Sequence, residues 1–177
     1  MTSSSTMRIL LGCDGFGEDL KNVVKGHLES KENIVVDDLG SDTYFDAAGN
    51  VAKQVSKSGG GDQEVMGILF CGTGMGVGIV ANKFPGVRAA TCENIAAGAA
   101  NKFPGVRAET CENIAAAKRA RAVNNANVLC LGKLVTPPDE AKKIVDSFLE
   151  QKFISQPEES ASWWNSDVEA FPEAAKS

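Results

Sequence analysis

Cys71 stands immediately before a glycine-rich turn, and together they could remove a proton next to a carbonyl group. The turn reads CGTGMGVG, from Cys71 to Gly78, and it follows the apolar run VMGILF. Backbone N–H groups at the start of a helix can hold an oxyanion, and the same field favours a thiolate. A thiolate beside such donors can act as a general base while they stabilise an enediolate. The alternative interpretation is a plain strand–turn–helix corner with a buried cysteine.

A second glycine turn, GCDGFG, places Asp14 at the tip of an earlier strand. Neither turn has the GxGxxG spacing of a dinucleotide site, because the sixth position counted from Gly72 is Val77. Neither has the GxxxxGK[ST] spacing of a P-loop either. We therefore expect no cofactor.

Short apolar runs alternate with helical patterns around these turns. Strands are expected at MRILLG, ENIVVDDLG, VMGILFCG, VRAATC and NVLCLG. Helices are expected at GEDLKNVVKGHLES, DAAGNVAKQVSKS, MGVGIVANKF, ENIAAAKRARAV and TPPDEAKKIVDSFLEQKF, with Thr136 as the N-cap of the last and SGGGDQ as a loop. This alternation predicts a parallel sheet covered by helices on both faces. Sites in such sheets lie beyond the carboxyl ends of the strands.

The composition suits one globular domain of 177 residues, 43% hydrophobic and 23% charged. A net charge of −5 argues against a nucleic-acid partner. The five cysteines form no CxxC pair and there is a single histidine, so no metal site is expected. No run approaches the roughly 18 apolar residues of a membrane span, and the start MTSSST lacks an apolar signal region. We expect a soluble, cytoplasmic protein that binds no membrane.

The segment NKFPGVRAATCENIAA, from Asn82, recurs from Asn101 as NKFPGVRAETCENIAA, an offset of 19 residues. The copies differ where Ala90 becomes Glu109. A new strand inside a parallel sheet would break the pairings beyond it, so we expect one copy in the sheet and the other as a surface excursion. Because a buried Glu109 would be costly, we expect the first copy in the sheet and the second partly looped out before Ala117.

The runs CGTGMGVGIVANKFPGVRA and ENIAAAKRARAVNNANVLCLG resemble the ribose-5-phosphate isomerase B family, which includes galactose-6-phosphate isomerase subunits; GCDGFGEDLK is similar to its first-strand turn. The resemblance covers residues 7–153 and implies a Rossmann-like three-layer α/β sandwich with a central parallel sheet. It also implies a homodimer or higher homo-oligomer, with each site made by two subunits. Residues 1–6 would form a disordered tail, and 82–116 would carry the duplication. The tail at 154–177 is similar to that of plant proteins described as DNA-damage-repair/toleration proteins.

The resemblance implies an aldose–ketose isomerase whose substrate is a small sugar phosphate. Cys71 would be the base that moves a proton between C1 and C2, with Thr73 as a second catalytic residue. The implied substrate-binding residues are Asp14, Gly72, Gly74, Gly76 and Asn124. The glycines and Thr73 would form the anion hole for the enediolate. The aspartate would hydrogen-bond sugar hydroxyls, and the asparagine would bind near the carbonyl end.

Four features depart from the family. Gly15 and Val123 stand where the family has histidines, the second of which opens the sugar ring, and Leu134 stands where it has an arginine. The tail at 154–177 lacks the arginines that clamp the partner's phosphate. Two hypotheses stay open: an isomerase of altered substrate choice, and a non-catalytic sugar- or phosphate-binding module. Because ring opening is lost, we expect surviving activity to favour short or open-chain sugars.

The remaining polar and aromatic candidates carry weaker signals. His27, at the edge of an apolar helical stripe, is expected to be structural or exposed. Candidates for a substitute phosphate-binding cation are Arg88, Arg107, Lys118, Arg119, Arg121 and Lys133. Two tail tryptophans are expected to dock on the domain or on a partner subunit, namely Trp163 and Trp164.

Overall fold

The fold is known from a computed structural model that describes residues 6–58, 65–87, 89–91, 109–110, 113–122 and 124–154. Its strands are β1 (Met7–Cys13), β2 (Ile34–Ser41), β3 (Val65–Cys71), β4 (Ala89–Thr91), β5 (Glu109–Thr110) and β6 (Val128–Gly132). Its helices are α1 (Glu18–Glu29), α2 (Tyr44–Lys57), α3 (Met75–Ala81), α4 (Ile114–Ala122) and α5 (Pro138–Glu150). The strands form one sheet in the order β2-β1-β3-β6-β4-β5, and every recorded pairing is parallel.

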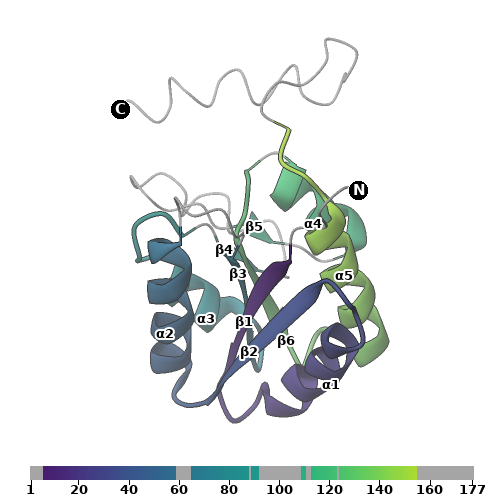
Figure 1. Cartoon of the computed structure of the whole chain (residues 1–177). Helices are drawn as coiled ribbons and strands as arrows, with labels where there is room; N and C mark the ends of the chain where they lie inside the picture. The colour runs from purple at the N-terminus through teal and green to yellow at the C-terminus, as the bar shows by residue number, and fades with distance from the viewer. Residues whose placement is uncertain are drawn as a thin grey trace.

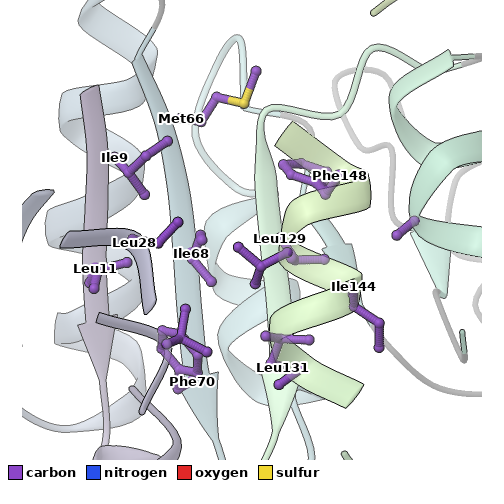
Figure 2. Close-up of a cluster of buried hydrophobic side chains, with 14 of the residues drawn as sticks. Ile9, Leu11, Leu28, Met66, Ile68, Phe70, Leu129, Leu131, Ile144 and Phe148 are labelled. Atoms are coloured by element: carbon purple, nitrogen blue, oxygen red, sulfur yellow. The ribbon is translucent and has the colours of Figure 1, made fainter. Parts of the chain in front are cut away.

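Helices cover both faces of the sheet, with α2 and α3 on one side and α1, α4 and α5 on the other (Figure 1). The central strands alternate their apolar side chains between the two layers. In β3, Ile68 and Phe70 pack toward α1 and α5 (Figure 2), whereas Leu69 and Cys71 pack toward α2 and α3. Burial on both faces explains why these strands are continuously apolar. The predicted Rossmann-like three-layer sandwich is confirmed.

The starts of α2 and α5 differ from the sequence prediction for reasons that the structure shows. Helix α2 begins at Tyr44, before the expected Asp46, because the Thr43 hydroxyl accepts the Asp46 N–H at 3.2 Å and caps the helix. Thr136 is not the N-cap of α5: that position belongs to Pro137, with Pro138 in the first turn. Thr136 is buried, and its N–H donates to the Gly132 carbonyl at 2.8 Å. The predicted loop SGGGDQ lies almost wholly outside the described residues.

Both copies of the duplicated segment contribute a strand. β4, from the first copy, pairs with β6, as expected. The buried Asn82 side chain fixes it, accepting the Ala89 N–H at 2.8 Å and donating to the Ala89 carbonyl at 3.1 Å. The second copy was expected to be partly looped out before Ala117, but its residues Glu109–Thr110 join the sheet as β5. This strand pairs with β4, with Ala90 opposite Glu109. The sheet admits the extra strand because it joins at the edge, where no existing pairing is broken.

None of the described helices combines the length and the apolar character needed to cross a membrane.

Candidate active site

The glycine turn after β3 holds Cys71 in a buried position. Its side chain is 5% exposed, and its Sγ accepts the Gly74 N–H at 3.0 Å. Gly74 caps α3 with a φ of +85°, a conformation that favours glycine. This hydrogen bond fixes the position of the sulfur within the glycine turn. The Gly74 N–H thus contacts the Cys71 sulfur in this structure, and the anion-hole role expected of Gly72, Thr73, Gly74 and Gly76 stays a prediction.

The turn after β6 is bonded directly to this glycine turn. The Lys133 N–H donates to the Cys71 carbonyl at 3.0 Å, and the Leu134 N–H donates to the Gly72 carbonyl at 2.9 Å. Gly132 packs so closely that a Cβ on it would lie 2.3 Å from the carbonyl carbon of Thr73. The backbone of β6 therefore sets the position of the turn that surrounds Cys71.

Asp14 lies at the same end of the sheet. Its N–H donates to the Phe70 carbonyl at 3.1 Å, which places it beside the end of β3. Its Oδ1 accepts the N–H groups of Phe16 and Gly17, each at 3.0 Å, and so fixes the turn into α1. The Asp14 side chain is partly exposed. The second carboxylate oxygen, Oδ2, is the atom that can meet a sugar hydroxyl.

Three exposed nonpolar side chains lie beside the glycine turn, and the sequence analysis singled out Leu134 but not Phe16 or Tyr44. A Cβ on Gly72 would lie 3.7 Å from Leu134 Cδ1 and 3.9 Å from Phe16 Cβ, and one on Gly76 would lie 3.2 Å from the Tyr44 ring. Phe16 and Leu134 are 72% and 74% exposed. The signal in the sequence is that each residue lies within a few positions of the end of a strand. We infer that the rim beside Gly72 is nonpolar.

Asn124 lies at the opposite end of the sheet from Cys71. In the pairing of β3 with β6, Cys71 stands opposite Gly132 and Gly67 opposite Val128. Asn124 precedes β6 and so lies beyond its amino end, where α4 also ends (Figure 1). The strand from Gly67 to Cys71 alone spans about 13 Å. A single chain therefore brings together Asp14, Cys71 and the glycine turn, but not Asn124.

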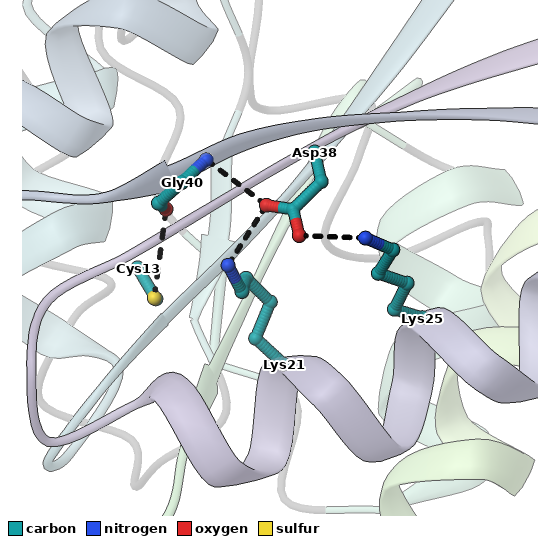
Figure 3. Close-up of polar contacts among 5 residues, drawn as sticks. All are labelled: Cys13, Lys21, Lys25, Asp38 and Gly40. Atoms are coloured by element: carbon teal, nitrogen blue, oxygen red, sulfur yellow. Dashed lines mark hydrogen bonds and ion pairs between the residues drawn. The ribbon is translucent and has the colours of Figure 1, made fainter.

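A partly buried ion network joins helix α1 to strand β2, next to the β1–α1 turn (Figure 3). Asp38 accepts hydrogen bonds from Lys21 Nζ at 2.8 Å, Lys25 Nζ at 3.0 Å and the Gly40 N–H at 2.9 Å. Partial burial alone would raise the pKa of the Asp38 carboxyl, but these hydrogen bonds outweigh that effect and hold it at about 2. Burial raises the pKa of the Cys13 thiol, whose Sγ lies 3.6 Å from the Gly40 carbonyl oxygen. The network ties α1 to β2, and the contact of Cys13 with Gly40 ties β2 to the end of β1, which Asp14 directly follows.

The histidine and the candidate cations named from the sequence lie in different parts of the structure. His27 Nε2 lies 2.8 Å from Asp146 Oδ1 and links α1 to α5, which fits the structural role expected of it. Arg121 is also structural, since it donates to Asn125 Oδ1 at 2.9 Å and to the Ala126 carbonyl at 2.6 Å. Lys118 and Arg119 are exposed on α4. The candidates outside the described residues are Arg88, Arg107, Val123, Trp163 and Trp164.

Comparison with known proteins decides the family. Residues 9–99 and again 96–162 match the family described as ribose/galactose isomerase. The chain belongs to this family. Two overlapping matches are what an internal duplication produces, because the family pattern resumes after the inserted copy.

This ribose/galactose isomerase family member is similar to relatives of different size. It is 35% identical over 166 residues to the DNA damage-repair/toleration protein DRT102 of Arabidopsis thaliana, covering 93% of this chain but 46% of that protein. The chain thus spans about half the length of that relative. It is also 35% identical over 152 residues to D-erythrulose-4-phosphate isomerase of Pectobacterium atrosepticum, covering 83% of this chain and 85% of that one.

A solved structure shares the fold. Ribose-5-phosphate isomerase B from Mycoplasma genitalium, with bound ribulose-5-phosphate, is 34% identical, with a TM-score of 0.69 over 86% of this chain and 89% of that chain. These comparisons favour the isomerase hypothesis and give no support to the non-catalytic binding module.

Gly15 remains a departure from the family sequence. It is exposed, and a Cβ on it would have no atom within 4 Å.

Proposed function

We propose that this chain is an aldose–ketose isomerase of a sugar phosphate and that Cys71 is its base. The observation that carries the proposal is the buried Cys71 Sγ, which accepts the Gly74 N–H at 3.0 Å at the carboxyl end of a central strand. Family membership supports the reaction class. Asp14, beside the same strand end, supplies a carboxylate for the substrate hydroxyls.

In the proposed reaction, the Cys71 thiolate removes the proton from C2 of the open-chain aldose. The C–H electron pair forms the C1–C2 double bond, and the carbonyl pair moves onto O1, which gives an enediolate. The N–H groups of Gly72, Thr73 and Gly76 stabilise the oxyanion. A proton passes from O2 to O1, and the thiol returns its proton to C1 to give the ketose. General bases of this kind contribute about 10²–10⁴-fold to the rate.

The proposed substrate is a short or open-chain sugar phosphate, such as erythrose 4-phosphate. A tetrose whose C4 oxygen carries the phosphate cannot close a furanose ring, so it needs no ring-opening histidine. Val123 stands where the resemblance places that histidine. The similarity to a D-erythrulose-4-phosphate isomerase supports this choice.

A second copy of the chain would complete the site. Asn124 lies beyond the amino end of β6, so in a homodimer of opposed subunits it would approach the partner's Cys71. The nonpolar rim at Phe16, Tyr44 and Leu134 supports contact with another surface, since large exposed nonpolar clusters are uncommon on monomers. The tail at 154–177 would dock on the domain or on that partner.

The test is proton exchange at C2 of erythrose 4-phosphate and ribose 5-phosphate in heavy water. Wild type is expected to exchange the erythrose proton faster, and Cys71→Ala is expected to lose at least about 10² of that rate. Cys130→Ala is the matched control, because it removes a buried thiol from the neighbouring strand β6. Equal or better use of ribose 5-phosphate would refute the substrate choice. No exchange of either sugar by folded wild type would leave a binding module instead.

A further inference from the structure

Lys133 lies beside the candidate site because its backbone is bonded there. Its N–H donates to the Cys71 carbonyl at 3.0 Å, and the next residue, Leu134, donates to the Gly72 carbonyl at 2.9 Å. The two bonds fix the start of the Lys133 side chain next to the turn that follows Cys71. Its position is therefore set by the same contacts that set the site.

Lys133 is also the one cation in the described turns that follow the strands. These turns span residues 14–17, 42–43, 72–74 and 133–137, and their other charged side chains are Asp14 and Asp42. Lys21, in the first turns of α1, is 3% exposed and engaged with Asp38. The anionic group of a substrate at this end of the sheet thus has one exposed lysine within these turns.

The ammonium group of Lys133 has a partner that a stronger anion can displace. It forms an ion pair with Asp19 Oδ2 from the first turn of α1. The two side chains are 44% and 78% exposed. Exposed ion pairs contribute little stabilisation, because water screens the attraction and both side chains lose conformational freedom. A phosphate monoester carries more charge than one carboxylate and accepts stronger hydrogen bonds from a cation.

We propose that the ammonium group of Lys133 leaves its ion pair with Asp19 and binds the phosphate group of the substrate. When the site is empty, Asp19 holds the ammonium group at the rim and competes with the phosphate. The inference rests on the proposed function for the identity of the substrate, and it assigns the phosphate contact to Lys133 of the chain that carries Cys71. Lys133 is then a substrate-binding residue, and Asp19 acts through it as a positioning residue.

The first test needs no turnover. Binding of inorganic phosphate is measured by calorimetry on wild type, Lys133→Met, Asp19→Asn and Lys57→Met. Lys57 is the matched control, since it is an exposed lysine at the far end of α2 and its loss changes the net charge equally. We expect Lys133→Met to weaken phosphate binding roughly tenfold, the effect of one charge-assisted hydrogen bond. Asp19→Asn should strengthen it, and Lys57→Met should leave it unchanged.

The second test separates binding from chemistry. With erythrose 4-phosphate, Lys133→Met is expected to raise KM roughly tenfold while kcat changes little, because the lost contact is present in both the ground and transition states. With D-glyceraldehyde, an unphosphorylated aldose too short to close a furanose ring, wild type and Lys133→Met should exchange the C2 proton equally. Phosphate binding that is the same in wild type and Lys133→Met would overturn the inference. If no sugar is turned over, the proposed function fails while the calorimetric test of Lys133 still stands.

Discussion

Gly132→Ala tests whether β6 sets the geometry of the site. The new Cβ would lie 2.3 Å from the carbonyl carbon of Thr73, 2.4 Å from its oxygen and 2.7 Å from its Cα, whereas ordinary contacts begin at 3.4 Å. Both sides of the contact are backbone, so no side chain can rotate away. The glycine turn must therefore move by about 1 Å, the difference between 3.4 Å and 2.3 Å.

A displacement of this size affects catalysis more than folding. Misplacing catalytic groups by about 1 Å can cost about 10²-fold in rate. Overpacking of a tight contact typically costs about 1–3 kcal/mol. For a chain of this length, each 1 kcal/mol lowers Tm by roughly 2–4 °C. We expect Gly132→Ala to be folded at 25 °C, with a Tm lower by several degrees and a kcat/KM lower by about 10²-fold.

The assay is isomerase turnover of erythrose 4-phosphate together with thermal unfolding followed by circular dichroism. Gly15→Ala is the control, because it makes the same substitution at the same end of the sheet where a Cβ meets nothing within 4 Å. It should leave both quantities nearly unchanged. If Gly132→Ala keeps wild-type kcat/KM and Tm, the close contact between Gly132 and Thr73 does not position the turn, and the reasoning is wrong.

Two further predictions concern stability. Gly26 lies inside α1 with open space around a Cβ, so Gly26→Ala should raise the free energy of unfolding by about 0.5–1 kcal/mol in urea titrations; a decrease would contradict the helix geometry. The pKa of Asp38 is lowered from 3.8 to about 2 in the folded state, so its stabilisation is present above pH 4 and is lost as the pH falls from 4 to 2. Its loss should contribute about 2 kcal/mol to acid destabilisation over that interval. Asp38→Asn should lack this part of the pH dependence of the free energy of unfolding. If that free energy changes equally with pH in the two proteins, the prediction is wrong.

The sequence predicted the sheet and the order of its elements well, because buried parallel strands are continuously apolar and the helices between them have a clear period. Strand β3 and helix α1 agree with prediction to within one residue at each end. The boundaries of the other helices were harder to predict. Thr43 caps α2 through a side-chain hydrogen bond, while the more obvious Thr136 turns inward and leaves the cap to Pro137. Local composition does not reveal which of two threonines faces a helix end.

The site was predicted in part. The spacing of the glycine turns placed Asp14 and Cys71 at one end of the sheet, because parallel strands share a direction. Two features depended on the three-dimensional arrangement of the chain and not on residue types or spacing. The Gly74 N–H donates to the Cys71 sulfur, and Asn124 lies beyond the amino end of its own sheet. The ion pair of Lys133 with Asp19 joins residues from opposite ends of the chain, and the sequence carries no signal of it.

The order of the strands also explains how the chain tolerates its repeat. Asp14 and Lys133 directly follow β1 and β6, and Cys71 ends β3. These three strands are consecutive neighbours in the sheet, and β4 and β5 lie outside them. A strand added beyond β4 widens the sheet by about 4.8 Å and changes no register within that trio. This edge of the sheet can therefore gain whole strands during evolution. An insertion between β3 and β6, in contrast, would separate the turns that follow these two strands, on which the proposed chemistry depends.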